Sequence, residues 1–293
     1  MKRTLGVNTW VWTSPLNDQS LRELAQKAAG IGFGAIELPV ESPGDWDAAR
    51  AADVMAEYSL TPYVIGAMGP RRNLVAAPAA QVRATQDYLR ECMRVATVLG
   101  ASYVAGPFYA ETGRTWRMSE SDRGAVVRDL RESLKPLVDE AAEAGITLGI
   151  EPLNRYETSI INTVEQALDV LGPLLGPGLG IALDTYHLNI EEKRPNDAIR
   201  AAGGHIAHVQ VCGNDRGAVG DDHTDWNNFL DALDEVGYGG ALNLESFTGE
   251  NDTIATAASI WRPLADSQDV LAQRSFDYLS RLQEEREMKV PVV

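Results

Sequence analysis

The segment ITLGIEPL at residues 146–153 is a short apolar run, and the helical pattern TVEQALDVLGPL follows it at residues 163–174. A second apolar run, LGIALDTYHL, covers residues 179–188. Apolar strands joined through a helix indicate parallel strands in a sheet that is covered on its faces. Each run carries an acid, Glu151 in the first and Asp184 in the second. The segment therefore predicts a strand–helix–strand unit with buried carboxylates.

The same alternation continues along the whole chain, where short runs rich in β-branched or aromatic residues precede segments of helical period. The predicted strands cover residues 5–12, 35–40, 62–68, 102–109, 146–153, 179–188, 206–213 and 241–247. The predicted helices cover residues 19–32, 47–58, 80–100, 120–145, 163–174, 195–204, 226–239 and 269–287. Eight such units predict an α/β fold, a (β/α)8 TIM barrel. We expect one domain over residues 1–293, in which residues from about 288 to 293 form a tail.

A doubly wound open sheet is the main alternative to the barrel. Its dinucleotide-binding version is not supported, because no GxGxxG motif follows the first predicted strand.

Composition restricts the classes of function. The formal net charge of −16 would repel a nucleic-acid backbone. No run of about 18 apolar residues predicts a membrane span, and the N-terminal segment lacks the apolar core of a secretory signal. Cys92 and Cys212 are the only cysteines and show no CxxC spacing, so disulfides and a structural zinc site are not expected. We therefore expect a cytoplasmic protein without a nucleic-acid or membrane partner.

Polar residues lie on four consecutive predicted strands, near the end at which barrel enzymes carry their chemistry. Glu151 ends the fifth strand, Asp184 the sixth and Glu245 the eighth, and Gln210 lies in the seventh. In a closed barrel, residues at the same height on consecutive strands converge near the axis. Three carboxylates and an amide oxygen require a cation there, because burying an unpaired carboxylate is costly. Oxygen ligands favour a hard divalent ion, Mn²⁺ first, with Mg²⁺ or Co²⁺ as alternatives.

Further polar and aromatic residues lie close to these strand ends. The polar ones are Glu157, His187, His208 and Arg216. A basic residue and an imidazole beside a metal ion could hold and polarise a hydroxycarbonyl substrate. The aromatic ones, which could line the same opening or simply pack, are Trp10, Trp12, Phe108, Tyr109 and Trp116. We include His208 and Trp116 among the candidate substrate-binding residues.

Several of these segments resemble those of a known family. The segments IEPLNRYET, LDTYHLNIEE, VCGNDRGAVG, LNLESF and IWRPLA are similar to the D-tagatose/D-psicose (allulose) 3-epimerases, which are xylose-isomerase-like TIM barrels. The resemblance runs from the first predicted strand to the last predicted helix. It implies a manganese-dependent isomerase of carbohydrate metabolism that acts on an unphosphorylated ketose. It also implies a homodimer or homotetramer.

The resemblance assigns roles to single residues. Glu151, Asp184 and Glu245 match the metal-binding acids of the family. Glu151 and Glu245 also match its two proton-transfer carboxylates, which implies deprotonation and reprotonation at C3 through a cis-enediolate. The residues that match those holding the O1 to O3 end of the substrate are Glu157, His187 and Arg216.

One position departs from the family pattern. Ketose 3-epimerases usually have a histidine ligand, in an HxH context, where this chain has Gln210 in HVQ. A glutamine oxygen can still bind Mn²⁺ or Mg²⁺, and hydroxypyruvate isomerases of the same superfamily resemble the glutamine version. An aldose–ketose or hydroxypyruvate-type isomerase on the same metal site therefore stays open, as does a lyase or C-glycoside-cleaving subunit.

Two alternatives from other classes have less support. A DNA repair endonuclease of this superfamily would require a histidine-rich zinc cluster, and the chain has four histidines and a strongly negative charge. A non-catalytic sugar-binding protein would not need two strand-end glutamates around an ion.

Overall fold

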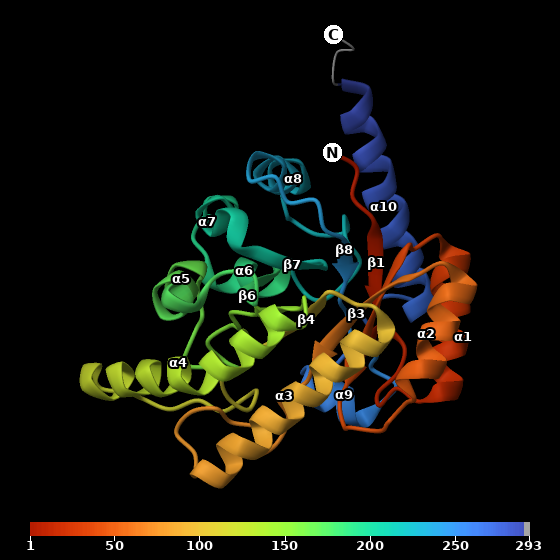
Figure 1. Cartoon of the computed structure of the whole chain (residues 1–293). Coiled ribbons are helices and arrows are strands. Elements are labelled where there is room, and N and C mark those ends of the chain that lie inside the picture. The colour runs from red at the N-terminus through yellow and green to blue at the C-terminus, as the bar shows by residue number, and fades with distance from the viewer. Residues whose placement is uncertain (290–293) are drawn as a thin grey trace.

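Eight parallel strands close into a barrel in the computed structural model, which describes residues 1–289 (Figure 1). The strands pair in chain order, and β8 closes the barrel against β1. The strands are Leu5–Asn8 (β1), Ala35–Val40 (β2), Thr61–Gly66 (β3), Tyr103–Gly106 (β4), Thr147–Ile150 (β5), Leu179–Asp184 (β6), Ile206–Val211 (β7) and Leu242–Leu244 (β8). The predicted (β/α)8 TIM barrel is confirmed.

Helices surround the barrel (Figure 1). They are Asp18–Ile31 (α1), Ala48–Tyr58 (α2), Ala79–Leu99 (α3), Glu120–Glu143 (α4), Val164–Leu171 (α5), Thr185–Glu191 (α6), Pro195–Ala202 (α7), Trp226–Glu235 (α8), Asp252–Ala257 (α9) and Gln268–Lys289 (α10). Short 3-10 helices cover Thr9–Val11 (η1), Gly172–Leu174 (η2) and Gly203–His205 (η3). Strands β2 and β6 are buried along their whole length, since one face points into the barrel and the other packs against helices.

Local sequence signals set several helix boundaries. Asn17 caps α1 in a capping box with Ser20, and Ser119 does the same for α4 with Asp122. Helix α1 ends at Gly32, whose φ of 118° lies in the left-handed region that glycine adopts easily. These caps satisfy backbone groups that a helix end otherwise leaves without partners.

Two polar caps make the first and sixth strands shorter than predicted. The Asn8 side chain accepts a hydrogen bond from the backbone N–H of Trp10, so β1 ends there and η1 begins. The Asp184 side chain accepts one from the N–H of Tyr186 and starts α6, so residues 185–188 are helical. Helices α6 and α9 were not predicted. Both follow strand ends directly or after a short loop, where they contribute to the opening of the barrel.

The end of the chain also differs slightly from the prediction. Helix α10 includes residues 288 and 289, which were predicted to open a tail, and residues 290–293 of that tail lie outside the described residues. Among residues 1–289, no helix combines the length and the apolarity that a bilayer crossing requires.

Candidate active site

A cavity of about 480 Å³ lies over the carboxyl ends of the strands. Residues that directly follow β3, β5 and β8 line it, which places it where barrel enzymes carry their chemistry. The predicted site residues in its lining are Glu151, Glu157, His187, Arg216 and Glu245. The side chains of Asp184 and Gln210 are buried and contact these lining residues from below.

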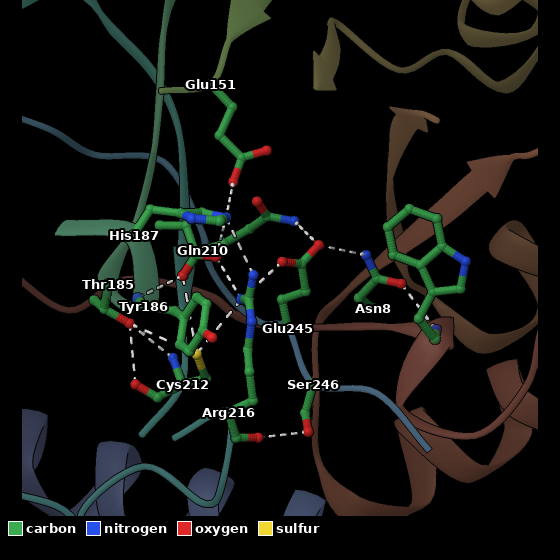
Figure 2. Close-up of polar contacts among 12 residues, drawn as sticks. Asn8, Glu151, Thr185, Tyr186, His187, Gln210, Cys212, Arg216, Glu245 and Ser246 are labelled. Carbon is green, nitrogen blue, oxygen red and sulfur yellow. Dashed lines mark hydrogen bonds and ion pairs between the residues drawn. The ribbon is translucent and has the colours of Figure 1, made fainter. Parts of the chain in front are cut away.

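The two glutamates come from strands that are not neighbours in the barrel. Glu151 follows β5 and Glu245 follows β8, and the backbone N–H of each donates to a carbonyl of the preceding strand, at Gly106 and Val211. Both residues are buried. Figure 2 shows the two carboxylates reaching the same region from different sides.

Burial and mutual repulsion change the acidity of both groups. Burial, together with the negative charges of Glu245 and Asp184, raises the pKa of Glu151 well above its ordinary value. Burial also raises the pKa of Glu245 well above its ordinary value, although the guanidinium of Arg216 opposes this rise. A raised pKa favours the protonated form of a carboxyl group, so each glutamate can hold a proton as well as accept one, which is what general acid–base catalysis requires.

Arg216 is the cation that this structure places among the carboxylates. Its Nη1 donates to Asp184 Oδ2 and, at 2.9 Å, to Glu245 Oε2. The guanidinium lies 4.2 Å from the ring centroid of Tyr186 and 5.0 Å from that of Phe247. The φ of Arg216 is +70°, an uncommon value for a residue other than glycine. Its carbonyl accepts a hydrogen bond of 2.6 Å from Ser246 Oγ, which helps to hold this loop in place.

His187 is a neutral imidazole beside the carboxylates. Its Nδ1 accepts a hydrogen bond of 3.0 Å from the backbone N–H of Asn154, and its Nε2 lies 3.2 Å from Arg216 Nη2, so N–H donors face both ring nitrogens. Burial lowers the pKa of His187, which favours this neutral form. Nε2 lies 3.5 Å from Glu151 Oε1 and 3.7 Å from Asp184 Oδ2. The side chain of Asn154 also donates to Glu157 Oε1 at 2.7 Å, so one residue positions both His187 and Glu157.

The donor groups fit a divalent cation. Ligand atoms of Glu151, Asp184 and His187 lie within 4.8 Å of one another. Glu151 Oε1 is buried and has no hydrogen-bond partner among the described residues, as expected for an oxygen that ligates a cation. His187 was predicted to bind substrate, and the structure places its Nε2 in this cluster as well.

Gln210 is oriented by its hydrogen bonds. Its Nε2 donates to Glu245 Oε1 at 2.7 Å and to Glu37 Oε2 at 2.9 Å. In Figure 2 the amide oxygen is drawn on the side of Glu151. The oxygen of the amide therefore faces Glu151, while its nitrogen faces Glu245 and Glu37.

Comparison with known proteins agrees with this geometry. The family model of the xylose isomerase-like TIM barrel matches residues 25–267. The chain belongs to this family. A ketose 3-epimerase from Arthrobacter globiformis is 30% identical, over 91% of this chain and 92% of its own length. An L-ribulose 3-epimerase from Methylomonas sp. (strain DH-1) is 29% identical, over 94% of this chain and 96% of its own length.

A solved structure is similar over almost the whole chain. It is a D-allulose 3-epimerase from Methylomonas sp. in complex with D-allulose, with a TM-score of 0.86 and 28% identity, covering 96% of this chain and 97% of that one. The resemblance to the ketose 3-epimerases is confirmed, as is the prediction of an enzyme of the sugar isomerase and epimerase class.

Two of the predicted substrate-binding residues do not line the cavity. In the pairing of β6 with β7, Gln210 lies opposite Asp184, whereas His208 lies opposite Ala182 and therefore deeper in the barrel. There its Nε2 lies 2.6 Å from Glu37 Oε1. This position corrects the prediction that His208 binds substrate.

Trp116 is the second correction. It is half-buried outside the cavity lining and packs under the guanidinium of Arg114, 4.9 Å from its ring centroid. Of the other aromatic candidates, Trp10 lines the cavity and donates from Nε1 to Glu41 at 2.9 Å. Phe108 and Tyr109 belong to the buried core.

The structure adds polar residues that the sequence did not single out. Asn8, Glu37 and Asn154 are all buried and hydrogen-bond to candidate site residues. The sequence could have indicated Glu37, because it is an acid inside the apolar run AIELPV. It could not have indicated Asn8 and Asn154, because asparagine is common in turns.

Proposed function

We propose that this chain is a metal-dependent ketose 3-epimerase that acts on an unphosphorylated ketose. The observation that carries the proposal is the pair of buried glutamates, Glu151 and Glu245, with raised pKa values on two sides of one cavity. The ketose 3-epimerases among the relatives support the substrate class. A homodimer or homotetramer in the cytoplasm stays a prediction.

The two glutamates exchange protons with C3 of the substrate. One carboxylate takes the proton from C3. The electron pair of the C3–H bond then forms the C2–C3 double bond, and negative charge develops on the C2 oxygen. The product of this step is a cis-enediolate. The other glutamate then gives a proton to the opposite face of C3, which restores the ketone with inverted configuration. Afterwards the two carboxyl groups return to their starting protonation states through solvent.

Neighbouring donors stabilise the charge that develops on the substrate oxygens. Arg216 and His187 line the cavity, and Asn154 holds His187 and Glu157 in place before substrate binds. A divalent ion held by Glu151, Asp184, Gln210 and Glu245, Mn²⁺ by preference, would polarise the substrate carbonyl as a Lewis acid.

Much of the cavity lining suits an uncharged group. It includes the apolar side chains of Trp10, Phe247, Ile254, Ala257 and Ala258. The guanidinium of Arg72 also lines the cavity, but it donates to the carbonyls of Ala67 and Glu41 and stacks on Tyr88, 3.6 Å from its ring centroid. A phosphate there would meet apolar walls and the nearby carboxylate of Glu41. We therefore propose a free ketose rather than a phosphate ester.

The function is tested with Mn²⁺-loaded protein and a panel of ketoses that includes fructose, tagatose and ribulose. We expect a C3 epimer of at least one sugar, loss of activity in EDTA and recovery on addition of Mn²⁺. The terminal phosphate ester of the preferred sugar should have a kcat/KM at least about 100-fold lower than that of the free sugar. This difference corresponds to about 3 kcal/mol. An aldose product in place of the epimer would favour the isomerase alternative to which Gln210 points.

A further inference from the structure

A buried carboxylate that the proposed reaction does not use lies beneath the candidate metal ligands. Glu37, on β2, has no solvent exposure. Its Oε2 accepts hydrogen bonds from Gln210 Nε2 at 2.9 Å and from Asn8 Nδ2 at 2.7 Å, and its Oε1 lies 2.6 Å from His208 Nε2. Side chains from β1 and β7 thus contact both carboxylate oxygens. Burying a carboxylate costs free energy, and these contacts offset part of that cost.

The first consequence concerns Gln210. The two ends of a glutamine amide have nearly the same shape, but one donates and the other accepts. Nε2 faces two carboxylate oxygens, Glu37 Oε2 and Glu245 Oε1, and a reversed amide would set its own oxygen against both. Glu37 therefore helps to keep the nitrogen on the inner side, so that the oxygen faces Glu151 (Figure 2). A neutral amide can ligate a cation only through this oxygen.

The second consequence concerns Glu245. Its Oε1 receives Gln210 Nε2 at 2.7 Å and Asn8 Nδ2 at 3.4 Å, and both of these amides also donate to Glu37. Glu37 is therefore linked to Glu245 through two shared donors. His208 supports Glu37 from the other side, and its ring packs 5.2 Å from that of Tyr63.

We propose that Glu37 is a positioning residue that fixes the amide orientation of Gln210 and, through Gln210 and Asn8, the place of Glu245. The inference rests on the proposed function, because it assigns Gln210 and Glu245 to a metal site. Removing a hydrogen-bonding partner of a metal ligand typically lowers the affinity for the metal about 10–100-fold.

The test is calorimetric titration of metal-free protein with Mn²⁺. Glu37→Gln should bind Mn²⁺ about 10–100-fold more weakly than the wild type, because the amide of Gln210 loses the carboxylate that orients it. In a Gln210→Ala background, the same substitution should change affinity by less than about threefold, since only the weaker link to Glu245 through Asn8 is left. Tyr63→Phe is the matched control: it alters the same buried layer without touching Gln210, and its Mn²⁺ affinity should equal that of the wild type.

A second variant covers the case in which Glu37→Gln does not fold. Glu37→Asp keeps the charge but shortens the side chain, and it should weaken Mn²⁺ binding in the same direction. Wild-type affinity in the folded Glu37 variants, or an equal loss with and without Gln210, would overturn the inference while leaving the proposed function intact. Failure of the wild type itself to bind Mn²⁺ would instead remove the proposed function, and the inference with it.

Discussion

Replacing Glu151 or Glu245 by glutamine is expected to lower kcat by at least about 10³-fold. Glutamine has nearly the same shape but cannot take or return the C3 proton, and general acid–base catalysis alone contributes about 10²–10⁴-fold. Each substitution also removes a carboxylate oxygen from the candidate metal site, which adds to the loss. The measurement is steady-state turnover of the preferred ketose at saturating Mn²⁺, with circular dichroism to establish that each variant is folded.

Glu192→Gln is the matched control for these variants. Glu192 is a half-buried acid at the end of α6 that accepts a hydrogen bond from the N–H of Val164 at 2.8 Å, outside the cavity lining. Its glutamine variant should retain wild-type turnover. The double variant of Glu151 and Glu245 should be little worse than either single variant, because the two groups act in one reaction. Turnover within about tenfold of the wild type in either single variant would contradict the assignment.

Arg216→Gln is expected to lower the free energy of unfolding of the metal-free protein by about 3–5 kcal/mol. The Arg216 side chain is 7% exposed and pairs with the buried carboxylates of Asp184 and Glu245. The substitution leaves these carboxylates without the cation that offsets their burial. Urea denaturation in the presence of EDTA measures the loss.

The loss should also depend on pH. Arg216 opposes the rise that burial causes in the pKa of Glu245, so its removal raises that pKa further. A carboxyl group whose pKa is raised by folding binds protons more tightly in the folded state, so stability falls as pH rises from its ordinary pKa toward the raised one. The loss in free energy of unfolding of Arg216→Gln should therefore be larger at about pH 8 than at about pH 5.

Arg22→Gln provides the comparison for the stability measurement. Arg22 forms an exposed ion pair with Glu57 at 2.7 Å, and exposed pairs contribute little to stability. This variant should unfold like the wild type at both pH values. If Arg216→Gln did the same, Arg216 would not be the group that offsets the buried carboxylates.

The barrel could be predicted from the sequence because each strand is a short apolar run followed by a helical pattern. Helix α6 could not, since it begins within the apolar run at residues 179–188, and only the cap that Asp184 provides separates strand from helix. Helix α9 has only six residues, too few for a helical period to stand out.

Residues at the same height on their strands could be placed near one another from the sequence. Glu151, Asp184 and Glu245 lie at strand ends, and the barrel brings them together: Glu151 and Glu245 line the cavity, and Asp184 shares the partner Arg216 with Glu245. Alternation along β7 predicts that His208 and Gln210 point to the same side of the strand. It does not give their depth in the barrel, and His208, two residues before Gln210, lies below the cavity.

The epimerase mechanism is tested most directly by incubating Mn²⁺-loaded protein with the preferred ketose in D₂O and locating the deuterium by NMR. We expect deuterium at C3, together with the C3 epimer, because the proton removed by one glutamate exchanges with solvent before the other glutamate returns one. Deuterium at C1 or C2 with an aldose product would contradict it and establish the aldose–ketose isomerase instead. No deuterium in any sugar of the panel, with metal bound, would contradict both forms of proton transfer.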